Sequence, residues 1–288
     1  MAEQLPPDSY LDPRPLLRKY NLRARHKLGQ NFLVSPGALH AIVEAAELQP
    51  DDTVLEVGPG VGTLTAELAR YAGCVVAVEL DDTLVGVLRA ELGHVPNLHV
   101  LQGDILKLQH AEVVRERCGA PPYKVVANLP YYITSQVLRK LLEEEPRPEL
   151  VVVMVQKEVA ERAVAGPGEM SLLALSVQMY AEPRIVERVP AGAFVPRPDV
   201  DSAVLRLRTR PEPLFPDLPL ARFFEVAAAG FGQKRKTLLN SLSSNLEMEK
   251  AIVADALRQA NIEPSARAQE LRLEDWARLC TTLPAPTT

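Results

Sequence analysis

A short polar and aromatic segment, Asn-Leu-Pro-Tyr-Tyr at 128–132, follows directly on an apolar run. An amide side chain and a backbone carbonyl can accept the two N–H bonds of an exocyclic amine, and a tyrosine ring offers a face on which a planar base stacks. Asn128, Leu129 and Tyr131 supply these three groups, and Pro130 holds the turn. The spacing therefore predicts a site that holds the amine of a base such as adenine.

A glycine-rich segment after another apolar run is suited to a nucleotide-like ligand. It reads Glu-Val-Gly-Pro-Gly-Val-Gly-Thr at 56–63 and precedes a helical pattern. Glycines let the backbone turn sharply and approach such a ligand closely. The spacing departs from the dinucleotide fingerprint, which favours a ligand without a pyrophosphate. Gly60 and Gly62 can alternatively serve only the packing of the strand against the helix.

Carboxylates stand at the ends of the next two expected strands. Glu79, followed by Leu80, ends one strand, where a carboxylate can accept both hydroxyls of a ribose. Asp104 ends the next and can accept from an adenine amino group, while Ile105 covers the ring. Either acid alone is more often a helix cap or a loop carboxylate. Their occurrence at successive strand ends favours S-adenosylmethionine over NAD as the ligand.

These groups suffice for methyl transfer to an amine. The adenine amine is a poor nucleophile because its lone pair is conjugated with the ring. Hydrogen bonds to the Asn128 side-chain oxygen and the Leu129 carbonyl localise that lone pair as the nitrogen becomes tetrahedral, which stabilises mainly the transition state. No general base is then required, and positioning in line with the methyl–sulfur bond supplies much of the remaining rate.

Short strands alternate with helical patterns along the part of the chain that must position these groups. Runs rich in Val, Ile and Leu predict seven strands, at 53–57, 74–80, 98–102, 123–127, 150–155, 184–189 and 202–208. Helical patterns lie between them, at 38–47, 64–71, 83–92, 135–144 and 172–179. This alternation is typical of α/β proteins with a doubly wound, mostly parallel sheet, here of the Rossmann-like methyltransferase size.

The pattern changes after residue 209. The stretch 210–219 holds four prolines and lacks periodicity, which is typical of a linker. Beyond it the pattern is wholly helical, at 220–230, 235–246, 250–260 and 273–283. We therefore expect a methyltransferase domain with a basic N-terminal arm over residues 1–209 and a small all-α domain over residues 210–288.

The charge of the chain is uneven. Its net charge of −5 argues against a protein that coats nucleic acid indiscriminately. Segment 14–27, however, carries six basic residues and no acid, and Lys234, Arg235 and Lys236 form a second basic cluster. Local basic patches suit a phosphate-backbone partner held at chosen points, although a solvated face is the alternative interpretation.

Composition and cysteine spacing limit the remaining classes. With 288 residues, 47% hydrophobic and 24% charged, the chain has the composition of an ordinary globular protein. No segment is apolar over the length needed to span a bilayer or resembles a signal peptide, so we expect a cytoplasmic protein. Cys74, Cys118 and Cys280 are far apart, and we expect neither a disulfide nor a metal site from them, only buried apolar residues.

Eight segments match one known family in order. They are Leu-Gly-Gln-Asn-Phe-Leu at 28–33, the glycine-rich segment 56–63, Glu-Leu at 79–80, Gly-Asp at 103–104, Asn-Leu-Pro-Tyr at 128–131, Gln-Lys-Glu-Val at 156–159, Phe-Val-Pro-Arg-Pro-x-Val-Asp-Ser-Ala-Val at 194–204 and Gln-Lys-Arg-Lys-Thr at 233–237. Over nearly its whole length the chain resembles the KsgA (RsmA) family of ribosomal RNA adenine dimethyltransferases.

The resemblance implies a reaction and a partner. A protein of this family moves four methyl groups in total from S-adenosylmethionine to the exocyclic amines of two adjacent adenosines. These lie in the hairpin loop near the 3′ end of small-subunit (16S) ribosomal RNA. We accordingly expect a monomeric enzyme without a metal that acts on the immature 30S subunit and takes part in its biogenesis. Dimethylation rests on the resemblance alone, because the sequence does not show the pocket volume.

The resemblance also assigns roles in the donor half of the site. Asn31 and Leu33 would lie over the methionine end of the donor, and Gly58 would lie against its backbone. Glu79 would hold the ribose and Asp104 the adenine.

In the target half, Asn128 would stand between donor and target. Tyr131 would stack on the flipped adenine, and Phe194 would close its other side. The alternative for Phe194 is a loop aromatic that covers the edge of the core. Tyr132 is as well explained by packing under the turn and is left out of the site.

RNA recognition is expected from the two basic segments. Arg23, Arg25 and Lys27 in the arm, and the cluster 234–236, would bind phosphates and set the register, while the loop bases are read after being splayed out.

Three other functions remain as alternatives. One is a methyltransferase of the macrolide-resistance type that acts on large-subunit RNA, which shares the glycine-rich segment but departs in the region 194–204. The second is a ribosome-assembly factor for which RNA binding matters more than methylation. The third is a DNA adenine methyltransferase, a class that has proline where this chain has Leu129.

Overall fold

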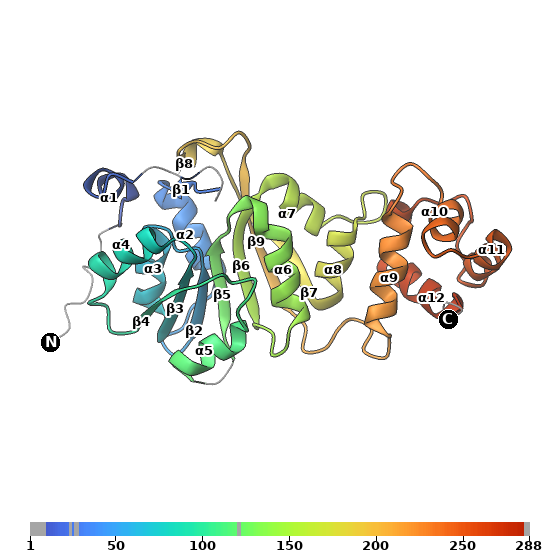
Figure 1. Ribbon diagram of the computed structural model, residues 1–288, viewed down its shortest axis with the longest axis horizontal. Coiled ribbons are helices and arrows are strands. Elements are labelled where there is room, and N and C mark those ends of the chain that lie inside the picture. Colours follow the sequence, from blue (N-terminus) through green and yellow to red (C-terminus); the bar gives the residue numbers. More distant parts are fainter. Residues whose placement is uncertain (1–9, 23–24, 26–28, 120–121, 285–288) are drawn as a thin grey trace. The chain divides into compact units, whose positions relative to one another are not determined.

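The computed structural model describes residues 10–22, 25, 29–119 and 122–284 of the chain (Figure 1). Contacts group the chain into two compact units. One comprises Met1–Ala160 and Glu182–Thr209, and the other comprises Glu161–Ala181 and Arg210–Thr288. No helix in the described ranges is both long enough and apolar enough to cross a membrane.

A seven-stranded sheet forms the centre of the first unit. Its strands are β2 (Thr53–Val57), β3 (Cys74–Glu79), β4 (Leu98–Gln102), β5 (Lys124–Asn128), β6 (Leu150–Gln156), β7 (Ala181–Val189) and β9 (Ser202–Thr209). Their order in space is β4-β3-β2-β5-β6-β9-β7. Strands β2 to β6 pair in parallel, whereas β9 runs antiparallel to β6. The predicted mostly parallel sheet is confirmed.

The strand order reverses between β2 and β5. From β2 the chain builds outward through β3 to β4, then returns to place β5 on the other side of β2. In open α/β sheets such a switch point leaves a crevice at the carboxyl ends of the two strands, where ligands bind. The glycine-rich segment follows β2, and Asn128 is the last residue of β5. The topology therefore brings the two predicted halves of the site together.

Seven helices accompany the strands up to residue 163 in the described part of the chain. They are α1 (Pro13–Lys19), α2 (Pro36–Ala45), α3 (Thr63–Tyr71), α4 (Asp82–Leu92), α5 (His110–Cys118), α6 (Thr134–Glu143) and α7 (Lys157–Ala163). Side-chain caps fix three of the starts. Asp12 accepts from the Arg14 amide at α1, Ser35 from the Ala38 amide at α2 and Asp81 from the Thr83 amide at α4. Helices α1, α5 and α7 add to those that the sequence pattern predicts.

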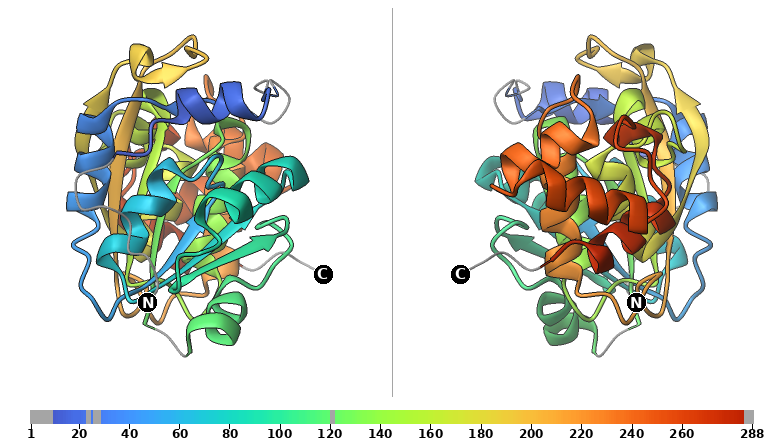
Figure 2. Two further views of the ribbon diagram at one scale, coloured as in Figure 1. Left: turned by 90° about the vertical axis from the view of Figure 1, so that its left-hand side faces the viewer. Right: turned by 90° about the vertical axis from the view of Figure 1, so that its right-hand side faces the viewer.

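A second, two-stranded sheet consists of β1 (Phe32–Leu33) and β8 (Phe194–Val195). The strands are antiparallel, with Leu33 opposite Phe194. In Figures 1 and 2, α1, β1 and β8 lie toward one end of the strands of the large sheet and α5 lies toward the opposite end. This small sheet attaches the segment around Asn31 near the end of the large sheet where the site forms.

Apolar packing of α2 and α3 on the large sheet holds the first unit together. Ile42 of α2, Leu68 of α3 and Val126 and Val152 of the sheet are fully buried in one cluster. Burial of a side chain of this size contributes about 1.5–3 kcal/mol. Strands β2, β3 and β5, which lead into site residues, are buried over most of their length, whereas β4 is only partly buried.

One sequence prediction is wrong, because Cys74 and Cys118 form a disulfide. Cys74 begins β3, and Cys118 ends α5, a helix that contacts β3. The sequence did not predict this bond because the two cysteines are 44 residues apart and come together only when the crossover helix returns along the sheet. Cys280 is free and buried, as expected.

The second unit is helical and includes one helix from before the proline-rich stretch. It holds α8 (Leu172–Tyr180), α9 (Leu220–Phe231), α10 (Leu238–Asn245), α11 (Lys250–Gln259) and α12 (Leu273–Thr282). Tyr180 of α8 stacks on Phe224 of α9. A Cβ at Gly230 would lie 2.4 Å from Trp276, so α9 and α12 pack closely there. The domain boundary at residue 210 stays a prediction, and α8 adds an earlier segment to the helical unit.

Candidate active site

A cavity of about 310 Å³ opens at the carboxyl ends of β2, β3 and β5. Twelve of the predicted site residues line it: Asn31, Leu33, Gly58, Gly60, Glu79, Leu80, Asp104, Ile105, Asn128, Leu129, Pro130 and Tyr131. They come from the segment around β1, the glycine-rich loop and the ends of β3, β4 and β5. The structure therefore brings residues from five separate segments into one pocket.

Phe194 is not among the described residues that line this cavity. It is 2% exposed and belongs to the apolar core under α2. Its partner across the small sheet, Leu33, does reach the cavity. The role of Phe194 against a target base stays a prediction.

The predicted RNA-binding residues are placed in part. Arg23 and Lys27 lie outside the described residues, whereas Arg25 is described. The cluster 234–236 is exposed in the turn between α9 and α10. No ion pair that the structure describes involves these three side chains.

The glycine-rich loop adopts a conformation that favours glycine. Gly58 and Gly60 have φ values of +68° and +63°, in the left-handed region that L side chains rarely adopt. Both line the cavity. Gly62 also has positive φ, but its added Cβ would lie 2.6 Å from Leu92 of α4. Packing therefore accounts for Gly62, and close approach to a ligand remains for Gly58 and Gly60.

The Glu79 carboxylate is buried and held by backbone donors. One oxygen accepts from the Asp81 amide at 2.9 Å and the other from the Gly60 amide at 3.1 Å. Burial raises the pKa of Glu79, the nearby Asp81 charge raises it further, and the backbone donors oppose the rise. Because each carboxylate oxygen has two lone pairs, both can still accept a hydroxyl of a ligand.

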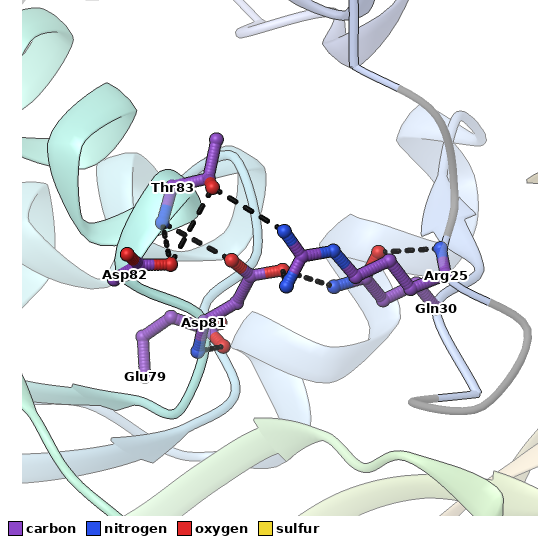
Figure 3. Close-up of polar contacts among 6 residues, drawn as sticks. All are labelled: Arg25, Gln30, Glu79, Asp81, Asp82 and Thr83. Atoms are coloured by element: carbon purple, nitrogen blue, oxygen red, sulfur yellow. Dashed lines mark hydrogen bonds and ion pairs between the residues drawn. The ribbon is translucent and has the colours of Figure 1, made fainter.

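Asp81 itself joins several segments around Glu79, as Figure 3 shows. One oxygen caps α4 by accepting from the Thr83 amide. The other lies 3.1 Å from Nη1 of Arg25 and accepts from Nε2 of Gln30 at 3.2 Å. Asp81, two residues after the end of β3, is therefore connected to the N-terminal arm.

Glu56, which ends in the same cavity, has no charged partner in the described residues. Its side chain is fully buried, and its Oε2 and the hydroxyl of Thr63 have no hydrogen-bond partner among the described residues. Burial raises the pKa of Glu56 to about 8, and the Glu79 charge adds to the rise. Burial in this cavity therefore favours the neutral form of the Glu56 carboxyl more than exposure to solvent would.

Asn128 and Leu129 are fixed at the end of β5. The Asn128 side-chain amide nitrogen donates to the Asn31 carbonyl at 3.2 Å, which leaves its oxygen as the acceptor end. The Leu129 amide donates to the Met154 carbonyl of β6, so Leu129 is buried under the turn. The Pro130 carbonyl accepts from the Ile133 amide and the Thr134 hydroxyl. The turn is rigid, and an amide oxygen and a backbone carbonyl remain to accept from an amine.

The two tyrosines of the cluster differ in environment. The Tyr131 hydroxyl lies 2.8 Å from the hydroxyl of Ser202, which is fully buried at the start of β9. Burial raises the pKa of Tyr131, so the hydroxyl is neutral. Tyr132 is half exposed and also lines the cavity. Both rings are therefore available to a planar ligand.

Asp104 and Ile105, which follow β4, also line the cavity. Asp104 Oδ1 accepts from the Leu106 amide at 3.1 Å, and its Oδ2 lies 3.7 Å from the exposed Lys107 amine. Ile105 is 5% exposed and presents an apolar side to the cavity. A carboxylate beside an apolar surface suits a base that carries an amino group.

Sequence reasoning missed four residues of this site: Gln30, Asp81, Tyr132 and Ser202. Asp81 carried the signal of an N-cap residue before a helical pattern. Ser202 carried no signal of its own, because its partner lies 71 residues earlier in the chain.

Comparisons with known proteins identify the family of this chain. The family model described as "Ribosomal RNA adenine dimethylase" matches residues 21–284. A "Ribosomal RNA small subunit methyltransferase A" of Dehalococcoides mccartyi is 50% identical over 95% of this chain and 93% of its own. A protein of the same name from Alkaliphilus metalliredigens is 40% identical over 92% of this chain and 94% of its own.

Two solved structures share the fold and part of the sequence. A dimethyladenosine transferase from Plasmodium falciparum superposes with a TM-score of 0.71 at 27% identity, covering 86% of this chain and 95% of its own. The 23S rRNA methyltransferase ErmE superposes with a TM-score of 0.67 at 34% identity, covering 88% and 99%. With the family model matched over almost the whole chain, this protein belongs to the ribosomal RNA adenine dimethylase family.

Proposed function

We propose that this protein transfers methyl groups from S-adenosylmethionine to the exocyclic amines of two adjacent adenosines in the 3′-terminal hairpin loop of small-subunit (16S) ribosomal RNA, two to each amine. The observation that carries this function is that Glu79 and Asn128 line one cavity at the switch point of the sheet. A nucleoside carboxylate and an amine acceptor in one pocket are the two halves that such a transfer requires.

The donor half fits S-adenosylmethionine. Glu79 keeps lone pairs for the ribose hydroxyls, Asp104 keeps an oxygen for the adenine amine, and Ile105 covers the ring. Gly58 and Gly60 let the backbone approach the ligand. The orphaned Glu56 oxygen in the cavity is a polar group without a partner, as expected where a ligand binds. When bound, this ligand would supply an electrophilic methyl group; its sulfur would leave with the bonding pair as a neutral thioether, and the proton of the methylated amine would pass to solvent.

The target half holds the amine. The Asn128 side-chain oxygen and the Leu129 carbonyl accept its two N–H bonds, which localises the nitrogen lone pair as the transition state forms. Tyr131, held by Ser202, stacks on the base that has been turned out of its strand. The acceptors belong to a rigid turn, so little reorganisation is needed when the substrate arrives.

The names of the relatives support the small subunit as the source of the RNA. Relatives named for the small subunit are 40–50% identical over more than nine-tenths of this chain. ErmE, which is named for 23S RNA, reaches 34%. We therefore favour 16S RNA over the large-subunit substrate, and RNA over DNA.

The partner we propose is the immature 30S subunit, bound by a monomer without a metal. The basic arm and the exposed cluster 234–236 would bind phosphates at two places. Because these segments offer more surface than catalysis needs, a role in subunit assembly can accompany methylation.

Labelled S-adenosylmethionine tests the substrate. The protein is incubated with undermethylated small subunits, large-subunit RNA or duplex DNA, and incorporation is counted. We expect label in the small subunits, and label confined to DNA or to large-subunit RNA would overturn the proposal. Glu79→Ala in the same assay should abolish methylation. If that variant still binds and matures small subunits, the assembly role is independent of catalysis.

A further inference from the structure

Two buried carboxylates stand two residues apart beside the donor half of the cavity. Glu79 is 7% exposed and Asp81 is 5% exposed. They share a hydrogen-bonded turn, because the Asp81 amide donates to a Glu79 carboxylate oxygen. A charge on Asp81 disfavours a charge on Glu79. Something must compensate Asp81 if Glu79 is to accept ribose hydroxyls as an anion.

The compensating group comes from the N-terminal arm. Nη1 of Arg25 lies 3.1 Å from Asp81 Oδ2, with the Asp81 side chain 3% exposed and the Arg25 side chain 54% exposed. Among the described residues, Arg25 is the one ion-pair partner of Asp81, and Glu79 has none. The Arg25 amide also donates to Gln30 Oε1 at 2.8 Å, while Gln30 Nε2 donates to the same Asp81 oxygen (Figure 3). Arg25 is therefore attached to Asp81 directly through its side chain and indirectly, through Gln30, by its backbone amide.

We propose that Arg25 is a positioning residue for the methyl donor: it compensates Asp81 beside Glu79 and so joins the basic arm to the donor cavity. This inference deepens the proposed function and rests on it. Arg25 is then held in the protein, while Arg23 and Lys27, two residues to either side, remain for phosphates. Donor affinity depends on the arm even though the arm supplies no group to the ligand.

The donor affinities of two single variants and their double variant distinguish this role from a merely structural one, because only charge compensation predicts that the double variant regains affinity. Arg25→Gln leaves Asp81 uncompensated beside Glu79, so it weakens donor binding. Asp81→Asn removes the charge that Arg25 compensates, yet its amide oxygen still accepts from the Thr83 amide and caps α4. The double variant lacks both charges, so it regains affinity that Arg25→Gln has lost.

Calorimetric titration of the full-length protein with S-adenosylmethionine tests this. We expect Arg25→Gln to raise the dissociation constant about tenfold, the equivalent of one pKa unit of differential interaction. Arg25→Lys, Asp81→Asn and the double variant should stay within about threefold of the unchanged protein. Arg115→Gln, which breaks an exposed pair with Glu112 on α5, is the matched control. In turnover, Arg25→Gln should raise the KM for the donor and leave kcat at saturating donor almost unchanged.

Two results would overturn the inference. One is unchanged donor affinity in Arg25→Gln, and the other is a double variant that binds no better than Arg25→Gln. Glu79→Ala separates this outcome from failure of the proposed function. If Glu79→Ala binds the donor normally, the donor assignment itself fails. If it loses the donor while Arg25→Gln does not, only the role of Arg25 is wrong.

Discussion

Asn128 ends β5 and lines the same cavity as the glycine-rich loop. Its side-chain nitrogen donates to the Asn31 carbonyl, so its side-chain oxygen is the atom that accepts from the amine in the proposed reaction. This arrangement uses the amide as an oriented dipole and requires no proton transfer to the side chain.

Replacement of Asn128 by Ala should therefore slow methyl transfer far more than it weakens binding. Loss of one preorganised transition-state hydrogen bond lowers kcat by about 10²–10³. Single-turnover rates at saturating donor and subunit measure the effect, with donor affinity and the unfolding temperature as controls. A rate within a few-fold of the unchanged protein would contradict the role given to Asn128.

The hydroxyl pair between Tyr131 and Ser202 predicts a coupled effect. A neutral hydrogen bond contributes about 1 kcal/mol, so we expect either Tyr131→Phe or Ser202→Ala to weaken RNA binding roughly fivefold. The double variant should be no worse than either single variant, because both remove the same bond. Affinities for the small subunit provide the measurement. Additive losses would show that the two hydroxyls act independently.

Glu56 predicts how stability depends on pH. Its pKa of about 8 in the folded protein lies above the ordinary value of 4.5, so the folded state keeps a proton that the unfolded state releases between these values. Stability from this group is full below pH 4.5 and is lost as pH rises toward 8. Glu56→Gln should remove a slope of up to about 1.4 kcal/mol per pH unit. Denaturant unfolding of both proteins at several pH values in this window measures it, and parallel curves would contradict the assignment.

At the scale of elements, the parallel sheet and its switch point decide where the site forms. The carboxyl ends of β2 and β5 meet because the strand order reverses between them. Residues that are 70 positions apart in the sequence, such as Gly58 and Asn128, thus line the same cavity.

The disulfide between β3 and α5 carries a stability prediction. Closing a loop with a separation of 44 residues restricts the unfolded chain, which contributes about 4 kcal/mol in the chain-entropy account. The free energy of unfolding of the double variant Cys74→Ser, Cys118→Ser should be lower by about this amount, and its donor affinity should be unchanged. Thiol titration of the denatured, unreduced protein should find one thiol, that of Cys280. Three thiols, or equal stability of the two proteins, would contradict the link.

Local patterns predicted the strands and the strand-end residues because each depends on neighbours in the sequence. Apolar runs and turn residues locate β2 and β5, and the positions of Glu79 and Asp104 in the sequence are enough to place them at strand ends. Contacts that depend on the tertiary fold were out of reach. The Cys74–Cys118 bond, the Ser202 partner of Tyr131 and the burial of Phe194 all arise from elements that are distant in the chain.

At the scale of the whole molecule, the proposed chemistry belongs to one unit, whereas the proposed RNA recognition is divided between the basic arm of that unit and the helical unit. The cavity lies in the unit built on the large sheet, and the exposed basic cluster 234–236 lies in the helical unit. A net charge of −5 with separate basic segments favours contacts at chosen points of a folded RNA over indiscriminate binding.

Mass mapping of the 3′-terminal hairpin of small-subunit RNA tests the central claim most directly. Undermethylated small subunits are treated with the protein and S-adenosylmethionine, and the hairpin fragment is weighed before and after. We predict that two adjacent adenosines each gain two methyl groups and that the Asn128→Ala protein adds almost none. A hairpin of unchanged mass, or methyl groups found only elsewhere in the RNA, would contradict the account.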